Sequence, residues 1–237
     1  MNPAGPDRAG DALVAEVRRA GFAALLQGRS ASAAELAAAA GAEEGAVAEV
    51  IATLVEAGRA TVTSDGRVDG IGGLSLRPGR HVILRQHILG QHILGRLAVR
   101  PGAVHPGGDG AAGHRRRLHT WCAFDAVAIP AALGWTARAV TTCGACGAGL
   151  AVTLVGGAPA GPAWGWLPPG DCEHVLRDFC SAADLFCDRA HLDAWRAAAG
   201  DPPGEARPVT ALAALGRKAW ADCLPARAPR PAPDPST

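Results

Sequence analysis

The sequence predicts an α+β protein in two parts: an N-terminal winged helix-turn-helix-like module, then a mixed domain with a small antiparallel sheet flanked by helices. Two observations predict this division. Three helical patterns and a short hairpin pattern precede residue 72. Alternating strand patterns, mixed with further helical patterns, follow residue 118. The 237 residues are enough to bury a substantial core.

The N-terminal helices are predicted from apolar spacing and from capping residues. Residues 11–27 carry apolar side chains at helical intervals. Ser32, followed three residues later by Glu35, is a capping-box pattern that starts a second helix, and Gly41 interrupts it. Residues 46–57 form the next amphipathic pattern. We therefore expect the second and third of these helices, joined by a turn at Gly41, to form a helix-turn-helix.

A β-hairpin is predicted directly after these helices. Residues 60–71 read as two short strands around a turn at 64–66. A helix-turn-helix followed by a hairpin describes a winged helix, which we place at residues 1–78. This module makes a DNA-binding regulator one candidate function.

The charges of the module disfavour that function. The expected recognition helix should carry basic or amide side chains, yet the region contains Glu43, Glu44, Glu49 and Glu56. Carboxylates facing phosphates are repelled. Arg59 and Arg67 are the basic residues of the hairpin region. We therefore predict a structural role for the module and no nucleic-acid partner.

Residues 79–117 are predicted to be a linker or insertion rich in His and Gly. The segment contains a tandem duplication, QHILGQHILG, that places His87 and His92 five residues apart. Other histidines nearby make a metal site conceivable; they are His81, His105, His114 and His119. A tolerated insertion ending in a Gly/Pro-rich loop is the favoured interpretation.

Residues 118–224 are predicted to form the domain that carries the thiol chemistry. A short helix over 120–129 meets Pro130, and strands follow in TARAVTTC and LAVTLV, separated by the glycine-rich turn CGACGAG. A third strand is expected in AWGWL, and helices are expected over 191–199 and 210–223. The Pro-rich tail, residues 225–237, is predicted to be disordered.

Composition limits the classes of function. Lys plus Arg number 23 and Asp plus Glu number 22, so no general attraction to nucleic acid or to an anionic membrane is expected. Residues 139–170 lack charged side chains, but Gly, Pro and Thr interrupt them, so no membrane span is predicted. The first residues do not match a secretory signal, and we predict a cytoplasmic protein.

The seven cysteines indicate metal binding or thiol chemistry. Their number is odd, and a cytoplasmic location keeps thiols reduced, which argues against a disulfide framework. Cys143 and Cys146 form a CxxC resembling a zinc knuckle. A structural zinc needs four ligands, so Cys122, Cys172, Cys180 or Cys187 would have to complete the site. A redox pair is the other interpretation of this CxxC.

A second thiol pattern lies in the segment TWCAFDAVAIP. Cys122 precedes Asp125 by three residues, a spacing that places both side chains on one face of a helix. Taken alone, this pair is more typical of a buried core cysteine near a partly exposed carboxylate than of a functional site.

The wider sequence resembles the organomercurial (alkylmercury) lyase family. LHTWCAFDAVAIPAALGWTARAVTTC is similar to the core signature of that family, and RDFCSAADLF is similar to the segment that holds its second essential cysteine. The resemblance covers most of the chain from about Ser32 to Trp220. Two separated thiol motifs in the family's order make it specific.

The resemblance implies a role for each matched residue. Cys122 matches the first catalytic cysteine, Asp125 the catalytic acid and Cys180 the second cysteine. Trp121 matches the aromatic residue beside the first cysteine, and Cys143 matches a cysteine treated as structural. Phe124 is expected to help Trp121 form an apolar pocket for the organic group of the substrate.

The implied reaction is protonolysis of a carbon–mercury bond. Thiolates are natural ligands of soft Hg(II), and an aspartate whose pKa is raised by an apolar pocket would supply the proton. No cofactor is needed. The implied partners are an organomercurial substrate, small-molecule thiols and a mercuric reductase that accepts Hg(II). The alternative is a mercury- or metal-binding sensor or transcriptional regulator without lyase activity.

Overall fold

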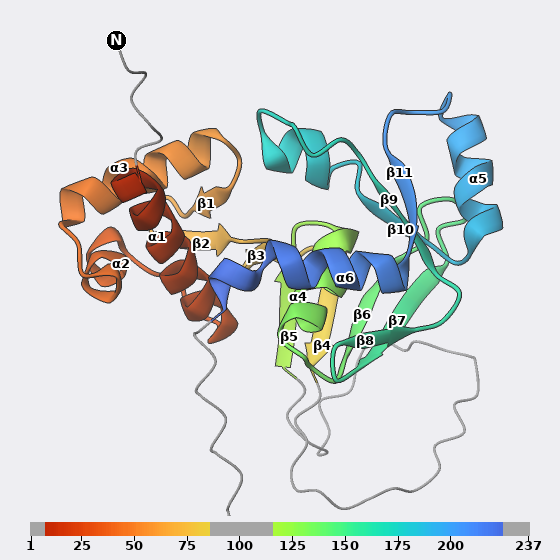
Figure 1. The fold of residues 1–237 in the computed structure, drawn as a ribbon, viewed down its shortest axis with the longest axis horizontal. Helices are drawn as coiled ribbons and strands as arrows, with labels where there is room; N and C mark the ends of the chain where they lie inside the picture. The colour runs from red at the N-terminus through yellow and green to blue at the C-terminus, as the bar shows by residue number, and fades with distance from the viewer. Residues whose placement is uncertain (1–7, 86–115, 225–237) are drawn as a thin grey trace, which may run out of the picture.

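The computed structural model describes residues 8–85 and 116–224 (Figure 1). In chain order its elements are α1 (Arg8–Leu26), α2 (Ala33–Ala40), α3 (Glu44–Glu56), β1 (Ala60–Val62), β2 (Val68–Ile71), β3 (Leu74–Ser75), β4 (His81–Arg85), β5 (Arg116–Thr120), α4 (Ala123–Ala132), β6 (Ala137–Thr142), β7 (Gly149–Val155), β8 (Ala158–Ala160), β9 (Trp164–Leu167), a π-helix (Val175–Cys180), β10 (Asp184–Phe186), α5 (Arg189–Ala198), β11 (Glu205–Pro208), α6 (Val209–Ala219) and a 3-10 helix (Ala221–Cys223).

Parts of two predictions lie outside the described residues. These are the duplicated segment with the histidines from His87 to His114, and the Pro-rich tail. Within residues 8–85 and 116–224, no helix is both long enough and apolar enough to cross a membrane.

The helices of the N-terminal part form where local capping predicts. The Ser32 side chain accepts a hydrogen bond from the backbone N–H of Glu35, and the Glu35 carboxylate accepts one from the backbone N–H of Ser32 at 2.7 Å. This confirms the capping box. Gly41 ends α2 in the left-handed conformation, at φ +65°, which glycine adopts without a steric penalty.

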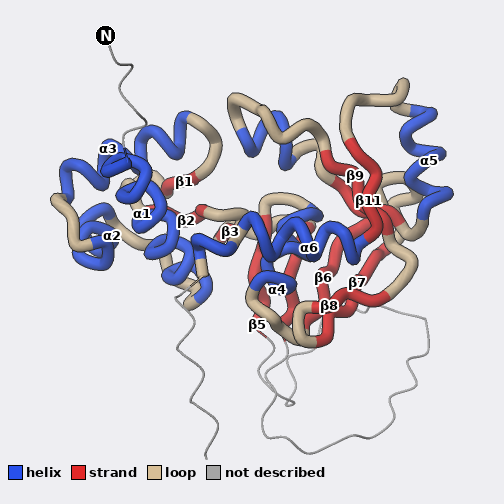
Figure 2. The backbone as a smooth tube through the Cα atoms, viewed as in Figure 1, coloured by secondary structure: helices blue, strands red, loops and turns tan. Residues whose placement is uncertain are grey.

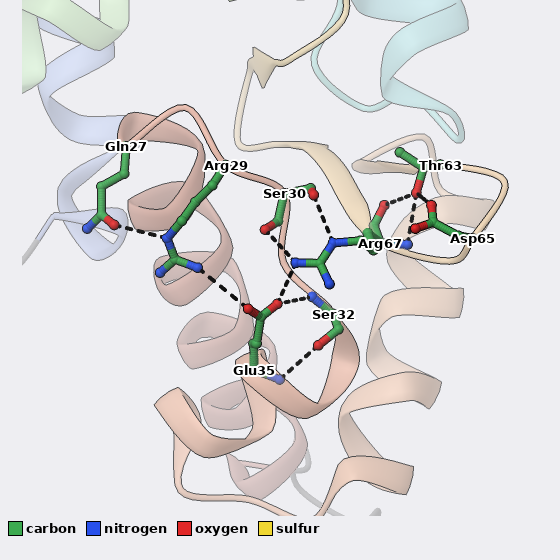
Figure 3. Close-up of polar contacts among 8 residues, drawn as sticks. All are labelled: Gln27, Arg29, Ser30, Ser32, Glu35, Thr63, Asp65 and Arg67. Carbon is green, nitrogen blue, oxygen red and sulfur yellow. Dashed lines mark hydrogen bonds and ion pairs between the residues drawn. The ribbon is translucent and has the colours of Figure 1, made fainter.

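Arg67 of the hairpin forms hydrogen bonds with Ser30 and with Glu35 of α2 (Figure 3). Its guanidinium donates to the Ser30 hydroxyl at 2.9 Å, to the Ser30 carbonyl at 3.0 Å and to the Glu35 carboxylate at 2.7 Å. One of the two cations available to a DNA-binding hairpin is therefore engaged within the protein.

The antiparallel sheet is larger than predicted. Eight strands pair in the order β1-β2-β3-β5-β4-β6-β7-β8, and every pairing is antiparallel. The predicted hairpin β1–β2 is present, but β2 also pairs with β3, so the sheet continues from the N-terminal part into the rest of the molecule. The prediction of a small sheet was wrong because the short strands near residue 75 lack a recognisable alternation.

The predicted linker contains a central strand. Strand β4 lies between β5 and β6 in the eight-stranded sheet, and its Ile83 is fully buried. Residues 81–85 therefore form a strand of the large sheet whose first three residues are buried, which corrects their assignment to a linker. The apolar run HVIL is too short to distinguish a buried strand from other apolar segments by periodicity.

Helix α4 is the central helix of the fold. Nine of its ten residues are buried, as expected for a helix covered on all sides. It packs against strands of the large sheet, and α6 packs along it (Figure 1). A Cβ atom added at Gly216 of α6 would lie 2.5 Å from the Ala128 Cα, so the absence of a side chain permits this close helix packing.

The C-terminal part contains a separate three-stranded sheet, in the order β10-β9-β11. The AWGWL segment thus forms a strand, as predicted, but it belongs to this second sheet and does not extend the β6–β7 hairpin. Helix α5 packs on β9 and β10, at the edge of the molecule (Figure 2). The core beneath this helix is small; its buried members are Cys143, Trp166, Phe186 and Leu192.

Candidate active site

Cys122 is the N-cap of α4. Its backbone is extended, with φ −142° and ψ 174°, and its side chain is fully buried. The prediction placed Cys122 inside the helix on one face with Asp125; the helix instead begins at Ala123. The spacing of three residues brings the two side chains together through a capping box, in which Cys122 takes the place of the usual Ser or Thr.

Asp125 receives two hydrogen bonds from Cys122. The thiol Sγ and the backbone N–H of Cys122 both donate to Asp125 Oδ2, each at 3.2 Å. Burial raises the pKa of Asp125 to about 7, although these hydrogen bonds act in the opposite direction. Burial, with smaller contributions from Cys180 and the Asp125 charge, raises the pKa of the Cys122 thiol well above its ordinary value. Asp125 can therefore hold or release a proton near neutral pH.

Cys180 completes the cluster from a distant part of the sequence. It is the last residue of the π-helix Val175–Cys180 and is 7% exposed. One ligand atom from each of Cys122, Asp125 and Cys180 lies within 4.8 Å of the other two. The structure thus brings together the three residues that the sequence resemblance singled out.

An apolar cavity of about 160 Å³ opens beside Asp125 and Cys180. Trp121 and Phe124, the two predicted substrate-binding residues, both line it. Phe124 contacts two other lining rings, Phe179 with centroids 6.1 Å apart and Trp220 at 5.7 Å. These contacts fix an aromatic wall next to the acid and the thiol.

The N-terminal part supplies residues that sequence reasoning missed. Arg18 of α1, Arg59, Gly72 and Gly73 line the cavity together with residues of α4 and α6. Gly73 has φ +84°, and a Cβ atom there would lie 2.7 Å from the Asp125 Cγ. A glycine is therefore required for the carboxylate to lie where it does. The Gly-Gly pair was the sequence signal that could have indicated a close backbone approach.

Trp220, the residue that follows α6, also lines the cavity. Its indole N–H donates to the Gly72 carbonyl at 2.8 Å. This bond links the end of α6 to the turn that faces Asp125, across 148 residues of sequence. The cavity therefore depends on contacts between both predicted parts of the chain.

A second thiol cluster lies away from this cavity. One sulfur atom from each of Cys143, Cys146 and Cys187 lies within 4.8 Å of the other two. Cys143 is buried, Cys146 is exposed and Cys187 is half-buried. Of the four cysteines considered as partners for the CxxC, the structure selects Cys187; Cys122 and Cys180 belong to the first cluster.

The histidines of the described residues are not grouped as metal ligands. His81 is buried, and its Nδ1 lies 2.8 Å from the Thr141 hydroxyl while its Nε2 accepts from Arg80 at 3.0 Å. Burial, followed by the charge of Arg80, lowers the pKa of His81 to about 4. His119 accepts a hydrogen bond from the backbone N–H of Gly79. Both therefore have structural partners.

Comparisons with known proteins agree on one family. Residues 111–221 match the family model described as alkylmercury lyase. An alkylmercury lyase of Pseudomonas putida is 33% identical over 106 residues, which cover 43% of this chain and 49% of that protein. The match thus spans about half the length of this relative.

The fold has a solved counterpart. A crystal structure described as the mercury-bound form of MerB2 superposes with a TM-score of 0.70, covering 89% of this chain and 91% of the other at 19% identity. At this identity the likeness shows that the fold is shared. It extends over both predicted parts of the chain.

Proposed function

We propose that this chain is an organomercurial lyase that cleaves carbon–mercury bonds with Cys122, Cys180 and Asp125, because residues 111–221 match the alkylmercury lyase family model and a 33% identical alkylmercury lyase covers part of the chain. The observation that carries the proposal is the cluster itself. The Cys122 Sγ lies 3.2 Å from the Asp125 carboxylate, and Cys180 lies beside both at the end of an apolar cavity.

The reaction begins with capture of mercury from R–Hg–SR′, where R′S is a small-molecule thiolate. Mercury replaces the proton on Cys122 Sγ, and Asp125 accepts that proton because its oxygen is the nearest acceptor. Cys180 then binds the same mercury, and its proton leaves with the displaced R′S⁻ as R′SH. Two thiolates now donate electron density to mercury, and negative charge develops on the bound carbon.

Cleavage follows by proton transfer to carbon. Asp125 delivers its proton as the carbon–mercury bond breaks, and the bonding electron pair stays with carbon, giving R–H. Mercury remains as Hg(II) bound to Cys122 and Cys180. The sum is R–Hg–SR′ plus two thiols going to R–H, R′SH and a mercury bis-thiolate. A pKa of about 7 suits a group that first accepts and then donates this proton.

The size and polarity of the cavity support an organic group as its occupant. An apolar cavity of about 150 Å³ is large enough to hold benzene in a well-studied protein, and this cavity is about 160 Å³. The rings of Phe124, Phe179 and Trp220 supply an apolar wall. We therefore propose that aryl as well as small alkyl groups enter.

Small-molecule thiols would release the product by exchange with Cys122 and Cys180. Arg18 and Arg59 line the same cavity, and their positive charge would attract an anionic thiol carrying carboxylates. A mercuric reductase in the cytoplasm remains the proposed final acceptor of Hg(II).

The alternative of a DNA-binding sensor receives less support. In the described residues, α3 presents the exposed carboxylates Glu44, Glu49 and Glu56, Arg67 is engaged by Ser30 and Glu35, and Arg59 lines the cavity. These charges disfavour contact with phosphates. The N-terminal part instead supplies walls of the cavity.

Benzene release in a single turnover tests the proposal. Purified protein is mixed with phenylmercury and excess thiol, and benzene is followed over time. Cys122→Ser, Cys180→Ser and Asp125→Ala are run beside the unmodified protein. Benzene from the unmodified protein alone is expected. Tight mercury binding without benzene would reject the lyase and leave a sequestering or sensing protein.

A further inference from the structure

The cluster Cys143, Cys146 and Cys187 has no part in the proposed lyase reaction. Cys143 and Cys146 belong to the turn between β6 and β7, and Cys187 directly follows β10. The Cys146 and Cys187 sulfurs are 3.9 Å apart, and both lie within 4.8 Å of the Cys143 sulfur. All three are free thiols. The packing of two sheets therefore gathers three soft ligands from two chain segments.

The turn has the backbone features of a metal knuckle. In Cys-Gly-Ala-Cys-Gly, the Gly147 N–H donates to the Cys143 carbonyl at 2.9 Å, and Gly147 has φ +70°. The Cys143 N–H also donates to the Ala148 carbonyl at 2.8 Å. These backbone hydrogen bonds hold the two cysteines of the turn on the side that faces Cys187.

We propose that Cys143, Cys146 and Cys187 bind a zinc ion through three thiolates, with an exogenous fourth ligand on the exposed side of Cys146. Tetrahedral zinc with bonds of about 2.3 Å places its sulfur ligands about 3.8 Å apart. The Cys146–Cys187 separation of 3.9 Å agrees with this spacing. A linear mercury bis-thiolate would hold its two sulfurs farther apart, at twice the bond length.

The charges of the cluster also favour a cation. The three sulfur atoms lie within 4.8 Å of one another. Three thiolates at this separation repel one another, and a divalent ion removes that repulsion and displaces the thiol protons.

Zinc at this position would join the two sheets. The β6–β7 turn already meets β10 through the Gly144 N–H and the Leu185 carbonyl, at 2.9 Å. The core beneath α5 has four buried residues, and metals commonly stabilise parts of proteins with too little apolar burial. Cys187 follows Cys180 by seven residues, so the ion would also anchor the segment that leaves the candidate active site.

Cobalt(II) substitution tests the site independently of lyase activity. The double variant Cys122→Ser/Cys180→Ser removes the other thiol cluster, and it is titrated with Co(II) under a phosphine reductant. One equivalent is expected to produce thiolate-to-cobalt charge-transfer bands and the visible bands of tetrahedral cobalt. Zn(II) should then displace the cobalt and abolish both.

A matched pair of cysteine variants locates the ligands. In the same background, Cys146→Ser is expected to weaken metal affinity more than about 100-fold, beyond the loss typical of an outer-shell partner. Cys172→Ser, a half-buried cysteine outside the cluster, should bind cobalt like the background. Cys187→Ser provides a second test, and far-ultraviolet circular dichroism confirms that each variant is folded.

Three results would overturn the proposal. The background variant could give no tetrahedral thiolate spectrum, Cys146→Ser could leave that spectrum unchanged, or a Cys146–Cys187 disulfide could persist under the phosphine reductant and block metal uptake. If the double variant binds cobalt but the unmodified protein releases no benzene, the lyase alone is refuted.

Discussion

The two thiol clusters use the same residue type in opposite surroundings. Cys122 and Cys180 are buried beside a carboxylate and an apolar cavity, and their cluster contains a single acid that can move a proton. In the second cluster Cys143 is buried, but Cys187 is half-buried and Cys146 is exposed. Burial raises the pKa of Cys122 and so favours its thiol form beside Asp125, whereas the second cluster has no carboxylate within the group and is open to solvent at Cys146. Both clusters are built from cysteine, so it is their surroundings that favour catalysis at the first cluster and structural metal binding at the second.

The largest expected difference is in carbon–mercury cleavage. Cys180→Ser should lower the single-turnover rate of benzene release by about 10⁴-fold or more, as for the loss of one member of a catalytic unit. Cys172→Ser should change it by less than about threefold, because that thiol belongs to neither cluster. Equal rates in the two variants would contradict the assignment of Cys180.

The buried acid should make stability depend on pH. The pKa of Asp125 is about 7 when folded, against 3.8 ordinarily, so the unfolded chain loses this proton first as pH rises. The free energy of unfolding should therefore fall by about 4 kcal/mol between pH 4 and pH 8 through this group, and remain lowered above that range.

The variant Asp125→Asn measures how much Asp125 contributes to the pH dependence of the free energy of unfolding. Urea unfolding is measured for both proteins from pH 4 to pH 8, and the difference between the two curves cancels titrations that they share. The variant should lack the fall of about 4 kcal/mol. Parallel curves would show that Asp125 ionises normally in the folded protein.

A matched pair of glycine substitutions tests the position of Asp125. Gly73→Ala should reduce cleavage about 100-fold, because its Cβ would displace the carboxylate, for which a shift of about 1 Å suffices. Gly66→Ala has the same kind of strain, at φ +79°, but nothing lies within 4 Å of its added Cβ.

The two glycine variants also distinguish the effect of backbone strain from the effect of displacing the Asp125 carboxylate. Both variants should lose about 1–3 kcal/mol of stability from the positive φ, measured by urea unfolding. Only Gly73→Ala should lose activity. A similar loss of activity in Gly66→Ala would mean that backbone strain alone explains the effect.

The smallest expected difference concerns thiol accessibility. In metal-free protein, iodoacetamide should modify Cys146 at least about tenfold faster than Cys122, since reactivity follows exposure and thiolate character. Peptide mass spectrometry over time measures both rates. Zinc should slow the modification of Cys146 and leave that of Cys122 unchanged; protection of neither thiol would count against the zinc site.

Local sequence determined much of the secondary structure. The Ser32–Glu35 capping box, the left-handed Gly41 and the 60–71 hairpin depend on residues within a few positions of one another. The same is true of the contact between Cys122 and Asp125, although the predicted helix began three residues too early, at residue 120 instead of Ala123. Neighbours in the chain determine these features.

Tertiary structure alone decided which distant residues meet. Family resemblance suggested that Cys180 works with Cys122, but the sequence around either residue does not encode their contact across 58 positions. The partner of the CxxC was equally open until β10 placed Cys187 beside it. The Gly73 approach to Asp125 and the central position of β4 likewise arise from sheet pairing. Short-range patterns fix helices, turns and caps, whereas the two thiol clusters exist only because the whole chain packs.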